Sequence, residues 1–210
     1  ATFFKNSAII AFGSTTLCIV CAVPAGYAIA RMRFPGKRTI MSAMIVTQMF
    51  SAVVLLVGIY RLMVSMRLQN TRTGIILLVA AFNQAFAAWL LSGTFKSIPK
   101  EIEDAAWIDG CSRLSSLVRV MLPMAAPGIV TAVIFVFIHA WNEYVLTLVL
   151  IGDTSLKTFT VGLQAFFGYT NIEWWYVFAA ALIGTAPVLF LFQFLDKHLV
   201  SGLTAGAVKG

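Results

Sequence analysis

Charged side chains are scarce in this chain. Only 11% of its 210 residues are Asp, Glu, Lys or Arg, whereas soluble globular domains carry about 25%. Hydrophobic residues make up 60%, and the mean hydropathy is +0.91. This charge is too sparse for the surface of an ordinary soluble enzyme, and a disordered chain is poor in apolar residues. We therefore predict an integral membrane protein, most of whose surface faces lipid.

Residues that carry catalysis or bind metals are also few. His139 and His198 are far apart in the sequence and have no metal-ligand spacing. Cys18 and Cys21 have the spacing of a redox pair, but they lie inside a long apolar run rather than beside a βαβ pattern. We expect no catalytic residue and no metal site in this chain.

A nucleotide-binding loop is absent as well. No G-x-x-x-x-G-K-[ST] pattern occurs anywhere in the sequence. We therefore expect no cofactor bound by this chain, and any ATP and Mg²⁺ used with it must be bound by partner subunits. The net charge of +7 does not indicate a nucleic-acid partner, because the basic residues lie between apolar runs rather than in one stripe or tail.

Long apolar stretches are abundant instead. A membrane helix needs about 20 mostly apolar residues at about 1.5 Å rise each. The sequence predicts five spans, over residues 7–30, 40–60, 74–95, 123–150 and 174–195. They are apolar at odd and even positions alike, which excludes the alternating strands of a membrane barrel. We predict one all-α transmembrane domain over residues 1–210.

One further uncharged stretch, residues 158–172, is too short to cross a bilayer. We expect a non-membrane or interfacial helix there. Trp174, Trp175 and Tyr176 follow it where the last span begins, which is the place of an interfacial aromatic belt.

The basic residues predict an orientation. If the loop after the first span is cytoplasmic, ten basic residues lie inside: Arg31, Arg33, Lys37, Arg38, Lys96, Lys100, Arg113, Arg119, Lys197 and Lys209. Five lie outside: Lys5, Arg61, Arg67, Arg72 and Lys157. The positive-inside rule favours this arrangement, with the C-terminal tail 197–210 in the cytoplasm. It places residue 1 outside, so we expect a sixth helix before Ala1.

The cytoplasmic segment 96–122 is more polar than any other and predicts structure of its own. Pro99 suits the first turn of a helix, and the carboxylates that follow favour its positive end. Gly110 is placed to end that helix with a left-handed residue, and Ser112 to cap a second short one. Pro123 is expected to break the chain before the next span.

The residues of this segment resemble a known family. IPKEIEDAAWIDGCS (residues 98–112) followed by VMLP (residues 120–123) resembles the cytoplasmic "EAA" loop of ABC importer permeases. Asp104 stands where the family usually has Glu, and Val120 where it usually has Ile. The stretch 26–37 with Asn6 and Ser7, the stretch 141–144, and the tail 199–210 resemble the carbohydrate-type, MalG-like branch of that family.

The resemblance implies a multi-pass permease in a bacterial or archaeal inner membrane. It implies a second homologous permease subunit, two ABC ATPase subunits, an extracytoplasmic solute-binding protein and a sugar substrate as partners. The loop would act as a coupling helix docked in an ATPase cleft, through Glu103, Asp104, Ala105, Ala106, Asp109, Gly110, Leu122 and Pro123. The tail would contact the ATPase subunits through Gly202, Thr204, Gly206 and Lys209.

Polar residues inside the predicted spans have two open interpretations. They are Gln48, Asn83, Gln84, Asn142 and Glu143. Buried amides in a membrane commonly bond neighbouring helices. They also line solute pathways, since polar groups at membrane depth usually face the bundle interior. The sequence does not decide between these roles.

Other functions compete with a sugar permease. An ABC permease for another solute, such as a polyol phosphate, an amino acid or an oligopeptide, would share the loop but not the tail. A secondary transporter or channel without an ATPase would carry charges at mid-membrane, where this chain has almost none. A purely structural membrane subunit would show no solute-dependent ATP hydrolysis.

Overall fold

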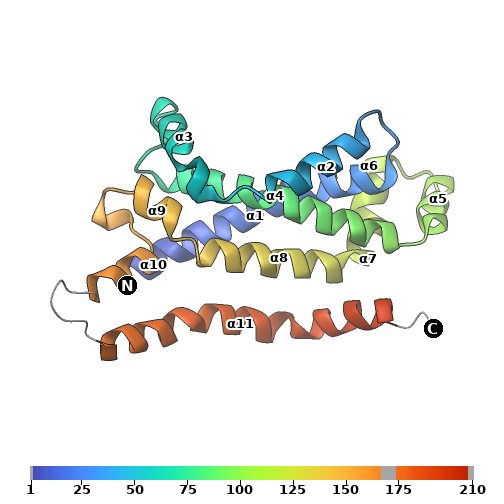
Figure 1. The fold of residues 1–210 in the computed structure, drawn as a ribbon. Coiled ribbons are helices and arrows are strands. Elements are labelled where there is room, and N and C mark those ends of the chain that lie inside the picture. The colour runs from blue at the N-terminus through green and yellow to red at the C-terminus, as the bar shows by residue number, and fades with distance from the viewer. Residues whose placement is uncertain (1, 167–173, 208–210) are drawn as a thin grey trace.

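The structure, a computed structural model, describes residues 2–166 and 174–207, and all regular elements in these ranges are helical. Figure 1 shows the long helices running side by side along a common direction. Helices α5 and α6 and the C-terminal end of α11 lie at one end, and α9, α10 and the start of α1 at the other. The elements are α1 (Thr2–Arg31), α2 (Lys37–Thr47), α3 (Ala52–Ser65), α4 (Arg72–Ser97), α5 (Lys100–Ile108), α6 (Arg113–Ser116), η1 (Leu117–Met121), α7 (Leu122–Met124), α8 (Ala126–Trp141), α9 (Val145–Leu150), η2 (Thr154–Leu156), α10 (Phe159–Gly162), η3 (Leu163–Phe166) and α11 (Trp174–Ala207).

Three of the described helices are long and apolar enough to cross a membrane alone. They are α1, α4 and the Trp174–Gln193 part of α11. Two bent pairs, α2 with α3 and the segment Arg113–Met124 with α8, raise the number to five if each pair is one span. The all-α membrane fold predicted from the sequence is confirmed.

The predicted span 40–60 is not one straight helix. α2 and α3 are bent by 101° at the break between them. The amides of Gln48, Met49 and Phe50 bond carbonyls three residues back, which tightens the end of α2. Ser51 is extended, and its side chain accepts from the Val53 N–H at 3.3 Å, so it caps a new helix.

The predicted span 123–150 is also divided. α8 ends at Trp141, and α9 begins after Glu143, whose side chain accepts from the Leu146 N–H at 2.8 Å. Before α8 the chain bends by 79° at Ala125, two residues past the proline expected to break it. Pro123 and Pro127 both lack an N–H, so the helical hydrogen bonds are interrupted on either side of this bend.

The core lies where α1 packs along α4 and α8. One buried cluster near the α5 end contains Tyr27, Leu91, Phe95 and Met121, and a second near the other end contains Phe137 among its members. Helices α1 and α4 are in close contact at a glycine of α1. A Cβ atom on Gly26 would lie 2.9 Å from the Leu91 Cβ. The α1–α4 contact therefore depends on small residues, as is common in membranes.

The end of the bundle opposite α5 is closed by hydrogen bonds. The Asn6 amide on α1 donates to the carbonyls of Ser155 (2.8 Å) and Lys157 (3.0 Å). The Ser7 hydroxyl accepts from the Phe159 N–H at 2.8 Å. These bonds hold the α9–α10 connection against the start of α1. The short helix expected over 158–172 is present as α10 and a 3₁₀ turn, η3, to residue 166, and its remainder lies outside the described residues.

The outer surface of the bundle is apolar. On α11, the large side chains of Trp175, Leu182 and Phe190 are exposed, and none of the described helices covers them. Trp174 and Tyr176 are exposed at the start of the same helix, where the sequence predicts an aromatic belt. This surface suits lipid or a membrane partner.

Candidate functional site

The segment 96–122, predicted to be cytoplasmic, folds as two short helices joined at Gly110. α5 begins at Lys100 directly after Pro99, and Gly110 has φ +86°. The Cys111 N–H donates to the Ala106 carbonyl and the Gly110 N–H to the Trp107 carbonyl, which is the Schellman arrangement of a helix C-terminus. The predicted left-handed glycine is confirmed.

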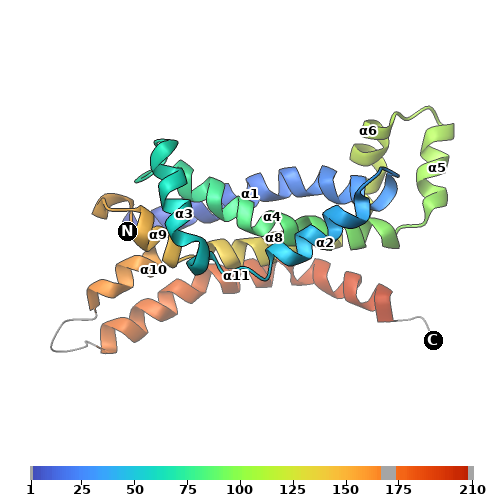
Figure 2. The same cartoon turned by 45° about the horizontal axis from the view of Figure 1, so that its top comes forward.

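The second helix of the pair is capped as the sequence predicts. The Ser112 side chain accepts from the Ser115 N–H at 3.2 Å at the start of α6. A π-helical turn, η1, then leads to α7 and the bend at Ala125. Figure 2 shows α5 and α6 projecting together from the end of the bundle.

α5 has two chemically different faces. Glu103 and Ala106 are buried against the rest of the chain, and Ile102 packs against the cluster that contains Tyr27. On the opposite face Ala105 is exposed and Ile108 is 86% exposed. Leu114 on α6 is 70% exposed, and Val118 follows it in η1. Within the described residues, nothing covers this apolar face.

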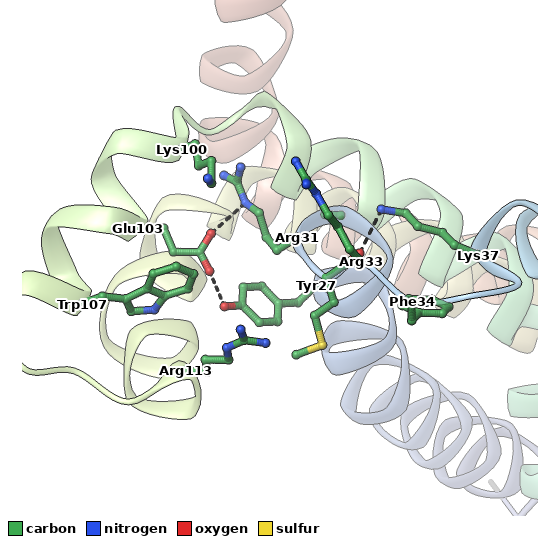
Figure 3. Close-up of a pocket in the computed structure, with 11 residues that line it drawn as sticks. Tyr27, Arg31, Arg33, Phe34, Lys37, Lys100, Glu103, Trp107 and Arg113 are labelled. Carbon is green, nitrogen blue, oxygen red and sulfur yellow. Dashed lines mark hydrogen bonds and ion pairs between the residues drawn. The ribbon is translucent and has the colours of Figure 1, made fainter.

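The buried face is anchored by a carboxylate. Glu103 is 1% exposed and receives a hydrogen bond from the Tyr27 hydroxyl on α1. The Arg31 Nε, also on α1, lies 3.1 Å from the Glu103 Oε2. A terminal nitrogen of Arg31 donates to the Ile98 carbonyl at 2.6 Å, just past α4. Figure 3 shows the three side chains converging. They connect α1 to the α4–α5 segment.

A basic recess opens beside this anchor. Its volume is about 680 Å³. Besides the anchor, its charged lining residues are Arg33, Lys37, Lys100 and Arg113 (Figure 3). The Arg113 guanidinium lies 5.7 Å from the Trp107 ring centroid, a cation–π contact that holds α6 against α5.

The residues that the resemblance assigns to docking fall into two groups. Asp104 is half-buried and lies 3.8 Å from the Lys100 ammonium at the surface, where such a pair contributes little. The exposed members of the set are Ala105, Asp109 and Gly110. By contrast, Glu103 and Ala106 are buried against their own chain. Leu122 is half-buried and Pro123 exposed, both in α7 beyond η1.

Tyr27 and Arg31 are the site residues that sequence reasoning missed. They are four residues apart on α1 and so share one helical face. Both belong to the stretch 26–37 that carries the family resemblance, and their spacing at the end of the first predicted span was the available signal.

The polar residues of the spans are distributed unevenly. The Asn83 amide donates to the Val79 carbonyl of its own helix at 2.8 Å. Gln84 bonds α1, with its amide nitrogen 3.1 Å from the Cys18 carbonyl and its oxygen 3.0 Å from the Ala22 N–H. Glu143 caps α9, as described above. Gln48 is exposed at the α2–α3 elbow, with its amide 3.4 Å from the Phe82 carbonyl.

Asn142, the fifth of these polar residues, is exposed after the end of α8. The tail residues Gly202, Thr204 and Gly206 lie in α11, which ends at Ala207. Lys209 lies outside the described residues.

The sequence matches the family described as "Binding-protein-dependent transport system inner membrane component" over residues 22–205. The chain belongs to this family. It is a multi-pass inner-membrane permease subunit of an ABC importer, and it works with separate ATPase subunits rather than as an ATPase itself. Membership decides against the secondary transporter and the purely structural subunit.

Named relatives agree with this assignment. The chain is 38% identical over 208 residues to the sulfoquinovosyl glycerol transport system permease protein SmoH of Agrobacterium fabrum, covering 99% of this chain and 73% of the relative. It is 35% identical over 207 residues to the trehalose transport system permease protein SugB of Mycobacterium tuberculosis, covering 98% and 76%.

A solved structure shares the fold. It is a bacterial ABC transporter involved in the import of the acidic polysaccharide alginate, with a TM-score of 0.80 over 93% of this chain and 74% of that one. The sequence identity is 24%, so this likeness shows the fold alone.

Proposed function

We propose that this permease subunit imports a sugar or glycoside. In the proposed complex it forms half of the solute pathway with a second homologous permease, two ATPase subunits and an extracytoplasmic solute-binding protein. The support for the substrate class is that SmoH and SugB are named for a sulfosugar glycoside and for trehalose. Transport proceeds by alternating access driven by the ATPase subunits.

The observation that carries the coupling role is the uncovered apolar face of α5, α6 and η1. We name Ala105, Ile108, Leu114 and Val118 the docking face. The docking face lies on short helical segments at one end of the bundle. An amphipathic helix that inserts its apolar face into a partner's groove needs such an accessible position. The Asp104, Asp109 and Gly110 positions border it. The groove of an ATPase subunit is the proposed occupant.

The proposed membrane orientation depends on which elements share one end of the bundle. Figure 1 shows the C-terminal end of α11 at the end of the bundle that carries α5 and α6. We therefore propose that both face the cytoplasm, with the tail residues Gly202, Thr204, Gly206 and Lys209 reaching the ATPase subunits.

Replacing Ile108 by glutamate tests the docking face. A buried unpaired carboxylate is unfavourable in an apolar groove, so the ATPase subunit is expected to co-purify with the permease at least fivefold less. The measurement is the ATPase-to-permease ratio after affinity purification of the assembled complex. Ile108→Leu, which keeps the apolar volume, is the matched control and is expected to retain wild-type stoichiometry. Equal ATPase content in the two variants would contradict the role of this face.

The proposed solute pathway runs past the α2–α3 elbow. A groove of about 510 Å³ lies between α2, α3 and α4, and Thr47, Phe50 and Phe82 are among its lining residues. Apolar walls with a few polar groups are typical of small-molecule sites, and aromatic rings suit the apolar faces of a sugar. We include Gln48 in the pathway because it is exposed at this elbow, and Asn142 because it is exposed after α8. Gln84 also lines this groove, so it remains a pathway candidate besides bonding α1. The hydrogen bonds of Asn83 and Glu143 favour structural roles for those two.

Uptake by the reconstituted complex tests the substrate class. Proteoliposomes with the cognate ATPase and binding protein are expected to accumulate at least one of trehalose, maltose, N,N′-diacetylchitobiose and sulfoquinovosyl glycerol in an ATP-dependent manner. An amino acid and a polyol phosphate serve as comparison solutes. Accumulation of a comparison solute with none of the four sugars would replace the sugar assignment by one of the alternative solutes.

A further inference from the structure

The burial of Glu103 needs an explanation beyond docking. A carboxylate removed from water is strongly disfavoured unless it is paired and hydrogen-bonded. Glu103 is the first of the docking residues assigned by resemblance, yet it is 1% exposed and faces its own chain rather than the surface. Its two partners, Tyr27 and Arg31, both come from α1. A residue placed in this way connects two parts of its own chain.

We propose that Tyr27, Arg31 and Glu103 form a mechanical link that makes the coupling helix α5 move together with α1. This inference rests on the proposed function, because it assigns positioning residues to the coupling site. The link would transmit a displacement of α5 by the ATPase to α1, and through α1 to the opposite end of the permease.

The chemistry of the link distinguishes it from ordinary packing. Apolar contacts such as those of Ile102 and Ala106 tolerate sliding, because they have no preferred direction. The hydrogen bond from Tyr27 to Glu103 is directional. Separating Glu103 from Arg31 would leave an uncompensated charge in a buried place. Arg31 is itself fixed by its bond to the Ile98 carbonyl, so its guanidinium is held at a defined position.

α1 is suited to carry such a displacement. It is continuous from Thr2 to Arg31 and contributes buried residues to both core clusters. Pro24 interrupts its hydrogen bonds, which would favour a hinge. Gln84 from α4 bridges the Cys18 carbonyl and the Ala22 N–H on the turn before that proline, and so braces the helix there. At its far end, Asn6 and Ser7 hold the 155–159 segment.

The decisive variants are Glu103→Gln, which removes the charge and keeps the shape, and Tyr27→Phe, which removes only the hydroxyl. Glu101→Gln is the matched control, because Glu101 is an exposed carboxylate on the same helix. All are assembled with the ATPase subunits and the binding protein in proteoliposomes. The measured quantities are ATP hydrolysis and uptake of whichever panel sugar the wild-type complex accumulates.

A mechanical link predicts a change in the solute transported per ATP hydrolysed. Glu103→Gln is expected to assemble with full ATPase stoichiometry and to hydrolyse ATP, while this ratio falls at least fivefold. Tyr27→Phe is expected to lower it by a smaller factor, and Glu101→Gln to leave it unchanged. If uptake and hydrolysis fall together in proportion to the assembled complex, Glu103 is merely structural and the proposal is overturned. An unchanged ratio in Glu103→Gln overturns it as well.

A distance measurement keeps this test separate from the substrate assignment. Spin labels at Arg33→Cys, two residues past the end of α1, and at Glu101→Cys on α5 report the separation of these two elements in the assembled complex by pulsed EPR, with Cys18, Cys21 and Cys111 replaced by alanine. One narrow distribution is expected with and without a non-hydrolysable ATP analogue and Mg²⁺, and a broadened one in Glu103→Gln. Equal widths would overturn the link, even if no panel sugar is transported and the proposed function fails.

Discussion

Replacing Gly26 by alanine is expected to destabilise the permease, although this change usually stabilises a helix. Alanine is favoured over glycine by about 1 kcal/mol inside a helix. At position 26 the added Cβ would lie 2.9 Å from the Leu91 Cβ, 3.1 Å from the Ser92 nitrogen and 3.2 Å from the Ala88 oxygen. Two of these atoms belong to the α4 backbone, so the helices themselves must separate. Such overpacking costs about 1–3 kcal/mol.

The measurement is the apparent unfolding temperature of the detergent-solubilised complex, with the yield of assembled complex from size exclusion. Gly93→Ala is the matched control, because Gly93 also lies in α4 and a Cβ there would meet nothing within 4 Å. The two variants are expected to shift the unfolding temperature in opposite directions, down for position 26 and up or unchanged for position 93. Gly26→Val, with two more methyl groups, is expected to lower the yield at least tenfold. Equal shifts for the two alanine variants would contradict the close α1–α4 contact.

The membrane class and the helix–Gly–helix segment of α5 and α6 were predictable because each depends on local chemistry. Runs of apolar residues determine where spans lie, and Pro99, Gly110 and Ser112 each act within a few residues of their position. The confirmed φ of Gly110 and the cap at Ser112 are of this kind. Features of this kind are predictable from the sequence, because they depend on residues that are close together in the chain.

The breaks inside the spans were harder to predict for a physical reason. The 101° bend at residues 48–51 occurs in a stretch, residues 40–57, with no proline or glycine, where hydropathy alone predicts a continuous helix. Ser51 was the available signal, since a serine before an apolar run is a cap candidate. The 79° bend at Ala125 followed from Pro123, but its position depended on Pro127 as well.

The buried anchor was not predictable, because it joins residues 76 positions apart. The sequence predicted that the carboxylates of α5 favour its positive end, and the resemblance assigned both Glu103 and Asp104 to docking. It did not show that Glu103 would turn inward while the neighbouring Asp104 stays near the surface. Glu103 is held inward by Tyr27 and Arg31 on α1. Only the tertiary packing of α1 brings these two residues beside α5.

Gly110→Val is expected to reduce uptake more than tenfold. Gly110 has φ +86°, a region that β-branched residues rarely adopt and that costs about 1–3 kcal/mol to impose. The turn at Gly110 sets the angle between α5 and α6, and so fixes how Ile108 and Leu114 lie relative to one another in the docking face. A distorted turn would separate them, and ATP hydrolysis would no longer drive the permease. The measurement is ATP-dependent uptake by the reconstituted complex, normalised to the assembled permease.

Two further variants test whether the loss of uptake depends on where the backbone strain is introduced or only on how large it is. Gly36→Val imposes a similar penalty, since Gly36 has φ +79° and a Cβ there would meet nothing within 4 Å, but it lies between α1 and α2. It is expected to keep most of the uptake. Gly110→Asn is also expected to keep most of it, because asparagine tolerates the left-handed region. If Gly36→Val abolishes uptake as fully as Gly110→Val, the loss reflects backbone strain in either loop rather than the geometry of the α5–α6 turn. Selective loss at position 110 would instead tie transport to the angle between the two coupling helices.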